Sequence, residues 1–270
     1  MITRPFGATG VNVAVIGQGT WGMGEDHAVQ KDEIAALRLG IELGMTHIDT
    51  AEAYGEGGAE RVVGRAVAGR RAEVFIATKV WPDNASEAGT LRACESSLKR
   101  LRTEYIDLYL LHWWSDEHPI GEAMRAMEEL VRRGLIRFIG VSNFEVAQLQ
   151  AARAALTQER LACNQVRYHL RDRKIERDLL PYCEEHRIAV VGYTPLAKGG
   201  FHRGVVAEIA RRHGRTPRQV ALNFLTGRQS LFAIPKASQP AHVRENAAAL
   251  DFRLSAADLK AIDAATQATW

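Results

Sequence analysis

The sequence is poor in cysteine and has no long apolar run. It has 3 cysteines in 270 residues and no Cys-x-x-Cys spacing, which argues against a disulfide framework and favours a reducing compartment. No apolar run approaches about 18 residues, so we expect no membrane helix. Residues 1–5 lack the apolar core of a signal peptide. These absences predict a cytoplasmic protein with no membrane partner.

An excess of one charge is also missing. The net charge is only +3 and the charged residues are interspersed, so nothing resembles a basic nucleic-acid tail. The densest basic stretch, residues 211–215, is interpreted as a solvated helix end, with an anion-binding site as the alternative. No cluster of metal ligands is evident. We therefore expect neither a nucleic-acid partner nor a bound metal.

What the sequence does contain is an alternation of short apolar runs with longer amphipathic segments. The apolar runs are continuous, which is typical of parallel strands covered on both faces. Eight such units in about 250 residues favour a closed sheet, so we predict an α/β fold, a (β/α)8 TIM barrel. The predicted strands are 13–16, 46–49, 74–78, 106–111, 138–141, 162–166, 188–193 and 231–234.

Helical patterns lie between these runs. Gly44 is a candidate cap at the end of the first, and Ser255 is a candidate cap at the start of an extra C-terminal helix. Residues 3–12, with two glycines, are predicted to form an N-terminal hairpin that plugs the barrel floor. No linker divides the chain, which predicts one domain over residues 1–270. The predicted helices are 31–43, 86–101, 120–133, 145–155, 177–186, 204–213, 242–250 and 255–266.

Polar residues end most of the predicted strands at the end of the barrel where such enzymes carry their chemistry. Asp49 ends the second strand and Tyr54 follows in the next loop, Lys79 ends the third strand and His112 the fourth. Each alone has an ordinary interpretation: a helix cap, a loop aromatic, a solvated charge and a buried histidine. Their joint placement at one rim favours a site.

These four residue types together suit a general acid. A tyrosine with a pKa near 10 is a poor proton donor at neutral pH, and an adjacent lysine lowers that pKa. An aspartate keeps the lysine charged, and a histidine can direct the oxygen of a substrate. We expect Tyr54 to protonate a carbonyl oxygen while Lys79 and Asp49 tune it and His112 orients the carbonyl. Such chemistry requires a hydride donor.

At these positions the chain resembles an aldo-keto reductase. The stretch from Asp49 to Gly55 resembles the family signature around its catalytic Asp and Tyr, and Lys79 and His112 match the family's Lys and His. The resemblance extends in order from Gly17 to about Leu250. Compact bacterial members similar to methylglyoxal reductases look closest. It implies the (β/α)8 barrel and the reduction of aldehydes and ketones with NADPH.

The resemblance also implies the residues that bind the nicotinamide cofactor. Two segments grip the carboxamide, one stacks an aromatic ring on the nicotinamide, and one binds the adenosine phosphate. The implied contacts are Gly19, Thr20, Trp21, Asp49, Ser142, Asn143, Gln165, Tyr193, Thr194, Pro195, Leu196, Lys198, Ile234, Pro235, Lys236, Ala237, Ser238, His242, Glu245 and Asn246.

Two positions depart from the family pattern of NADPH-preferring members. His242 stands where an arginine is usual, six residues after Lys236, and Ala237 replaces the usual serine. Lys236 alone can still pair with a 2′-phosphate, and the start of the following helix offers free N–H groups. We expect NADPH as the preferred cofactor and NADH as a weaker alternative. The Gly17–Gly22 stretch fits G-x-G-x-x-G, but no helix follows directly, so we reject a Rossmann fold.

Four tryptophans fall on the loops at the predicted barrel mouth. Trp21, Trp81 and Trp113 are expected to wall a substrate pocket with Tyr54 and His112, while Trp114 could equally serve packing. Without a long C-terminal loop the pocket should be open to small aldehydes, α-dicarbonyls such as methylglyoxal, and aromatic carbonyls. Residues 198–203 are basic and contain two glycines, which suggests a lid.

Two other classes of function stay open at this point. The chain could be a cofactor-sensing binding module, like the potassium-channel β-subunits that share this fold. It could also be a barrel enzyme with chemistry other than redox. The four candidate catalytic residues argue against the first alternative, and no additional domain offers a docking surface. We expect a monomeric enzyme.

Overall fold

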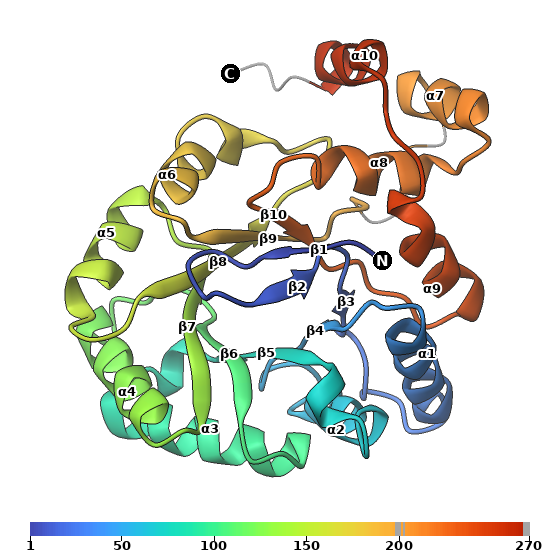
Figure 1. Cartoon of the computed structure of the whole chain (residues 1–270). Coiled ribbons are helices and arrows are strands. Elements are labelled where there is room, and N and C mark those ends of the chain that lie inside the picture. Colours follow the sequence, from blue (N-terminus) through green and yellow to red (C-terminus); the bar gives the residue numbers. More distant parts are fainter. Residues whose placement is uncertain (198–200, 202, 267–270) are drawn as a thin grey trace.

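A computed structural model describes residues 1–197, 201 and 203–266, and shows parallel strands surrounded by helices (Figure 1). The strands form an 8-stranded parallel sheet in which neighbours along the chain pair with one another. This arrangement confirms the predicted (β/α)8 barrel. The strands are β3 (Gln18–Gly19), β4 (His47–Asp49), β5 (Phe75–Val80), β6 (Ile106–Leu111), β7 (Ile136–Ser142), β8 (Leu161–Arg167), β9 (Ala189–Tyr193) and β10 (Leu231–Ala233).

Hydrogen bonds between the first and last strands close the barrel. The N–H of Gly17 donates to the carbonyl of Ala233 at 2.8 Å, and the N–H of Gly19 donates to that of Pro235 at 3.2 Å. Side chains do not fit at this seam, because a Cβ on Gly19 would lie 2.6 Å from the carbonyl oxygen of Ile234. Gly17 and Gly19 of the G-x-G-x-x-G match therefore serve strand packing, Gly22 lies in a turn with a φ of 76°, and the first helix begins only at Gln30.

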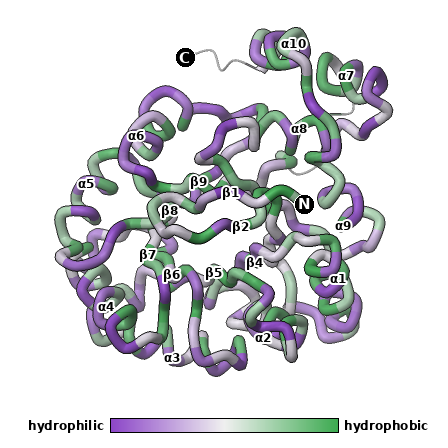
Figure 2. The backbone as a smooth tube through the Cα atoms, viewed as in Figure 1, coloured by the Kyte–Doolittle hydropathy of each residue, from purple (hydrophilic) through white to green (hydrophobic). Residues whose placement is uncertain are grey.

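Helices on the outside of the barrel cover the strands. Hydrophilic and hydrophobic residues alternate along each helix in Figure 2. Local signals set their ends. Ser86 caps α3, and Gly44 follows α1 with a φ of 86°. The helices are α1 (Gln30–Glu42), α2 (Gly58–Ala66), α3 (Glu87–Leu101), α4 (Ile120–Arg132), α5 (Val146–Ala155), α6 (Leu179–Glu185), α7 (Val205–His213), α8 (Pro217–Leu225), α9 (Pro240–Ala247) and α10 (Ala256–Thr266).

Two helices, α2 and α8, escaped sequence reasoning. Helix α2 is amphipathic but only 9 residues long, and it begins after Gly57 in a glycine-rich loop with no side chain to cap it, so the usual signal for a helix start is missing. Helix α8 does carry a signal: Thr216 and Gln219 form a capping box, and Pro217 occupies the first turn.

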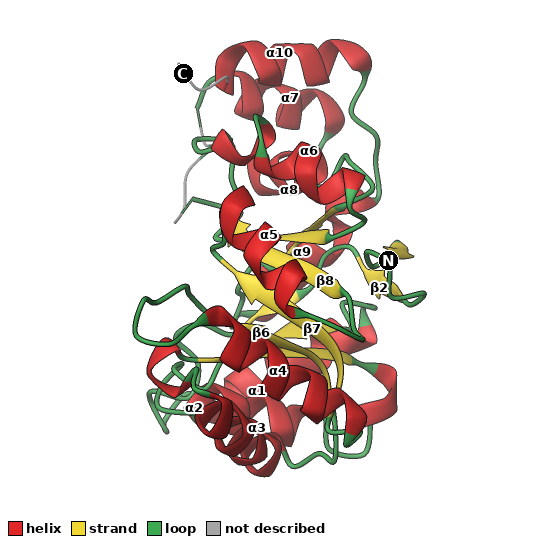
Figure 3. Ribbon diagram, turned by 90° about the vertical axis from the view of Figure 1, so that its left-hand side faces the viewer, coloured by secondary structure: helices red, strands yellow, loops and turns green. Residues whose placement is uncertain are grey.

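An N-terminal hairpin covers one end of the barrel, as predicted (Figure 3). Strand β1 (Thr3–Pro5) pairs antiparallel with β2 (Asn12–Ala14), and Phe6 between them is fully buried against the rings of Phe75 and Phe232. The prediction of a barrel strand at 13–16 is only partly right. Residues 12–14 belong to this hairpin, Ile16 pairs in parallel with Ala233 of β10, and the continuous barrel strand begins at Gln18. The apolar run is buried in either role, so hydropathy alone did not separate them.

The C-terminal helix α10 packs beside α7, outside the ring (Figure 1). The Ser255 hydroxyl accepts a hydrogen bond from the N–H of Asp258, which confirms the predicted cap. The Asp258 carboxylate also contacts Arg212 and His213. Two residues of the basic stretch 211–215 therefore contact a carboxylate within the protein. The three cysteines are buried and free, and no helix among the described residues is long and apolar enough to cross a membrane.

Candidate active site

The four predicted catalytic residues lie at the carboxyl ends of neighbouring strands. Asp49 ends β4, Lys79 lies near the end of β5 and His112 directly follows β6, while Tyr54 lies in the loop between β4 and α2. The Lys79 Nζ donates to both Asp49 carboxylate oxygens, at 2.8 and 2.9 Å, and to the Thr50 carbonyl at 2.8 Å. This fully buried ammonium is therefore paired and held in one position.

The Tyr54 ring lies between the lysine and the histidine. The Lys79 Nζ is 5.2 Å from the centre of the Tyr54 ring, and the His112 ring meets the Tyr54 ring edge-on with centres 5.7 Å apart. Burial raises the pKa of Tyr54 above its ordinary value, while the Lys79 charge lowers it and Asp49 raises it. The prediction of a lowered pKa is wrong here, because burial outweighs Lys79. The phenol is consequently protonated at neutral pH and can donate a proton.

The charges of the two neighbours follow from burial and pairing. Burial lowers the pKa of Lys79, but Asp49 and Tyr54 together more than offset this and the net direction is upward. For His112, burial and then the Lys79 charge lower the pKa to about 3. Lys79 is thus a cation at neutral pH and His112 is neutral. The buried Nδ1 of His112 has no hydrogen-bond partner among the described residues.

Polar residues from β7, β8 and β9 continue the same rim. Tyr193 donates its hydroxyl to the Oδ1 of Asn143 at 2.9 Å, and the Asn143 Nδ2 donates to the His112 carbonyl at 3.2 Å. The Ser142 hydroxyl donates to the Gln165 carbonyl at 2.9 Å. These residues, expected to grip a nicotinamide, are therefore joined to one another and to the catalytic group.

The first strand contributes a buried threonine to this rim. Thr20 donates from both its N–H and its hydroxyl to the Asp49 carbonyl, at 3.0 and 2.9 Å. After β9, Thr194 has a φ of 52°, and Leu196 is buried. The predicted contact Lys198 and most of the predicted lid, residues 198–200 and 202, lie outside the described residues.

The predicted adenosine-phosphate residues lie just before α9 and along it, from Lys236 to Asn246. Lys236 is exposed and contacts the Ser238 hydroxyl at 3.4 Å, and His242 lies half-buried in the first turn of the helix. Asn246 is buried, yet its Oδ1 has no partner among the described residues. An exposed lysine cation, a helix N-terminus and a buried amide oxygen that no described residue satisfies suit a phosphorylated adenosine. Glu245 accepts from Arg218 at 3.4 Å.

The tryptophans at the barrel mouth differ in their surroundings. The exposed fractions of Trp21, Trp81 and Trp113 are 64%, 37% and 41%, high for such large apolar side chains. The Trp81 ring meets the His112 ring edge-on, with centres 5.2 Å apart. Trp114 instead packs its ring against the buried Phe144, so its role is packing.

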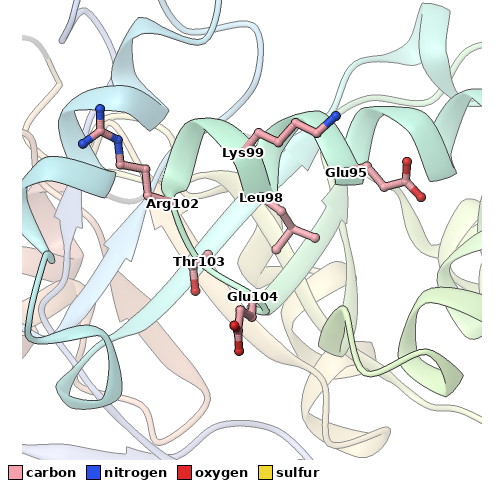
Figure 4. A pocket seen from close by; sticks show the side chains of 6 residues that line it. All are labelled: Glu95, Leu98, Lys99, Arg102, Thr103 and Glu104. Atoms are coloured by element: carbon pink, nitrogen blue, oxygen red, sulfur yellow. The ribbon is translucent and has the colours of Figure 1, made fainter.

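A surface groove of about 480 Å³ lies away from this site (Figure 4). It is lined by the end of α3 and the loop that leads into β6, at the amino end of the strand. The candidate site lies at the opposite, carboxyl end, so this groove has no part in it. The lining residues are Glu95, Leu98, Lys99, Arg102, Thr103 and Glu104.

Sequence reasoning missed three charged residues around the Tyr54 loop. The loop is flanked by Glu52 and Glu60, and Arg100 of α3 contacts both carboxylates. Glu52 lies inside the signature stretch, which was the available signal. Glu60 and Arg100 come from different helices, and nothing in the sequence links them.

The fold and site define an α/β-barrel enzyme, and comparison with known proteins gives its family. The aldo/keto reductase family model matches residues 15–267. Methylglyoxal reductase YeaE of Escherichia coli is 48% identical over 94% of this chain and 92% of its own. An aldo/keto reductase from Klebsiella pneumoniae, solved with NADP and acetate, is 44% identical with a TM-score of 0.93, covering 97% of this chain and 95% of that one.

A second solved structure gives the same result. The thermostable aldo-keto reductase Tm1743, in complex with the inhibitor epalrestat, is 41% identical with a TM-score of 0.94, covering 98% of this chain and 99% of its own. The chain belongs to the aldo/keto reductase family.

Proposed function

We propose that this protein reduces small aldehydes and ketones to alcohols with NADPH, and that Tyr54 donates the proton. The observation that carries the proposal is the placement of a protonated Tyr54 between the buried cation Lys79 and the neutral ring of His112. A proton donor next to a cation stabilises the negative charge that develops on a carbonyl oxygen.

Each residue has a distinct part in this reaction. Bound NADPH supplies the hydride for the carbonyl carbon. Tyr54 gives its proton to the carbonyl oxygen, and Lys79 stabilises the phenolate that remains. Asp49 keeps Lys79 charged in a buried site, where an unpaired ammonium would be costly. His112 is neutral, so it orients the carbonyl by hydrogen bonding rather than by charge.

Residues of this chain can contact each part of the cofactor. Ser142, Asn143 and Gln165 present amide and hydroxyl groups for the carboxamide, and Tyr193 presents a ring for the nicotinamide. Lys236 supplies a positive charge for the 2′-phosphate, and Asn246 has a buried acceptor available for the adenosine. The relatives solved with NADP and NADPH support this choice.

The substrate class follows from the mouth of the barrel. Tyr54 and His112 suit a molecule as small as methylglyoxal, and the apolar walls that Trp21, Trp81 and Trp113 offer beside them suit aromatic aldehydes. The methylglyoxal reductases among the relatives support the first of these. We further propose a cytoplasmic monomer whose residues 1–270 form one domain.

A turnover screen tests the proposal. NADPH oxidation is followed with methylglyoxal and 4-nitrobenzaldehyde, and NADH is tested in parallel. We expect turnover with both substrates and a higher kcat/KM with NADPH. Tight NADPH binding without any turnover would contradict an enzyme and favour a binding module, and no binding of either nucleotide would indicate chemistry other than redox.

A further inference from the structure

Carboxylates anchor both ends of the loop that carries Tyr54. At its start, the Oε1 of Glu52 accepts hydrogen bonds from the N–H of Trp81 at 2.7 Å and from the Nδ2 of Asn84 at 3.0 Å. At its end, the fully buried Glu60 accepts one from the Thr78 hydroxyl at 2.6 Å. Both carboxylates therefore tie the Tyr54 loop to β5 and its extension, the segment that also carries Lys79.

One guanidinium lies between the two carboxylates. The Nε of Arg100 donates to the Oε2 of Glu60, and its terminal nitrogen lies 3.9 Å from the Oε2 of Glu52. Arg100 also packs closely against the loop at Gly57. Any side chain at position 57 would collide with it, since an added Cβ would lie 2.4 Å from the Arg100 Cδ. Gly57 has a φ of 76°, a conformation that favours glycine. Glycine at position 57 thus leaves space for the Arg100 side chain.

Glu52 differs from Glu60 in what it holds. Its partner Trp81 meets the His112 ring at 5.2 Å, and Tyr54, two residues after Glu52, meets the same ring at 5.7 Å. The Glu52 side chain is only 11% exposed, although the donors Trp81 and Asn84 lie at the surface. A carboxylate acceptor makes stronger hydrogen bonds than a neutral one. Glu52 therefore sets the spacing between the proton donor and one wall of the pocket.

We propose that Glu52 is a positioning residue that determines substrate specificity by fixing the position of Trp81 relative to Tyr54. The inference rests on the proposed function. A substrate with an aromatic ring reaches Trp81, whereas methylglyoxal is small enough to bind at Tyr54 and His112. Loss of Glu52 should therefore impair aromatic aldehydes more than methylglyoxal, because only the larger substrate uses the wall that Glu52 positions.

The test compares Glu52→Ala and Glu52→Gln with Glu56→Ala. Glu56 is an exposed carboxylate in the same loop. Values of kcat and KM are measured with 4-nitrobenzaldehyde and methylglyoxal at saturating NADPH. For Glu52→Ala we expect kcat/KM for 4-nitrobenzaldehyde to fall roughly 10- to 100-fold, mainly through KM, since small misplacements cost this much. The fall for methylglyoxal should be several-fold smaller.

The other variants make the result specific. Glu52→Gln keeps an oxygen that can accept from the Trp81 N–H, so it should recover most of the aromatic activity; it also serves if Glu52→Ala fails to fold. Glu56→Ala should match the wild type. Equal losses with both substrates, or wild-type ratios in Glu52→Ala, would overturn the inference. A wild-type protein that reduces neither substrate would instead refute the proposed function, which separates the two failures.

Discussion

The Nε2 of Gln165 donates a hydrogen bond of 2.6 Å to the Oδ1 of Asp49, across the interior of the barrel. The two residues lie on β8 and β4, which are four strands apart in the ring of eight. The same Asp49 oxygen accepts from Lys79 at 2.8 Å. A residue expected to face the nicotinamide thus also supports the carboxylate that holds the catalytic lysine.

Replacing Gln165 should therefore weaken the fold as well as cofactor binding. For Gln165→Leu we expect a loss of about 1–3 kcal/mol in the free energy of unfolding, because a buried carboxylate loses a donor. Gln165→Glu should cost more at pH 7, since two carboxylates would meet, and it should recover as the pH falls and the new carboxyl is protonated. Urea unfolding at pH 5 and pH 7 measures both effects. Equal stability of Gln165→Leu and the wild type would contradict the role.

The Lys79–Asp49 pair should show strong coupling. Lys79→Met leaves Asp49 buried without its cation, which is expected to cost about 3–5 kcal/mol in the free energy of unfolding. The double variant Lys79→Met with Asp49→Asn removes both charges and should regain much of that loss, although both proteins should be inactive. Chemical denaturation gives the comparison. Additive losses in the double variant would show that the pair is not coupled.

Tyr54→Phe isolates the proton-transfer step. Removing the hydroxyl should lower kcat by about 10²–10⁴-fold, the usual contribution of a general acid. Because the ring stays in place, NADPH affinity should be nearly unchanged, as measured by quenching of tryptophan fluorescence. A fully active Tyr54→Phe protein would refute the role of Tyr54 as the proton donor.

His47 should make the protein sensitive to acid. Its ring is fully buried between Phe6 and Phe75 and both ring nitrogens lack partners among the described residues. Burial and the Lys79 charge lower its pKa to about 3, below the value near 6.5 of the unfolded chain. Between these values only the unfolded state binds the proton. Stability is therefore complete above pH 6.5 and falls as the pH drops toward 3, by on the order of 1 kcal/mol per pH unit.

Two variants test that assignment. His47→Asn should reduce the dependence of stability on pH in this interval by about one proton. The exposed His27→Asn serves as the control and should leave the dependence unchanged. The measurement is the urea midpoint from pH 4 to pH 7. His112, whose pKa is also lowered to about 3, should contribute a second proton to the wild-type slope.

Lys236 and His242 should control the choice between NADPH and NADH. Lys236→Met removes the positive charge proposed for the 2′-phosphate, so NADPH affinity should fall about 10- to 100-fold while NADH affinity changes little. His242→Arg restores a charged contact and should increase the preference for NADPH. Dissociation constants from fluorescence titration give both ratios. An unchanged ratio in Lys236→Met would place the 2′-phosphate elsewhere.

The sequence predicted the barrel and the four rim residues because both depend on local patterns. Continuous apolar runs marked the strands from β4 to β10, and polar residues at their ends marked the site. The first barrel strand was misplaced because residues 13–16 are buried in the hairpin as well as in a barrel. Helix α2 was missed because it is only 9 residues long and starts at Gly57 and Gly58 with no capping side chain, although its residues are amphipathic.

What the sequence by itself determined is the inventory at the rim: an aspartate, a lysine, a tyrosine to donate the proton and a histidine to orient the carbonyl. Only the tertiary structure decided their charges and partners. Burial raises the pKa of Tyr54 despite Lys79, and Gln165 reaches Asp49 from the opposite strand. Glu52, Glu60 and Arg100 meet around the Tyr54 loop although they come from separate elements. Desolvation and long-range contacts arise from the packing of distant segments, which local sequence patterns do not encode.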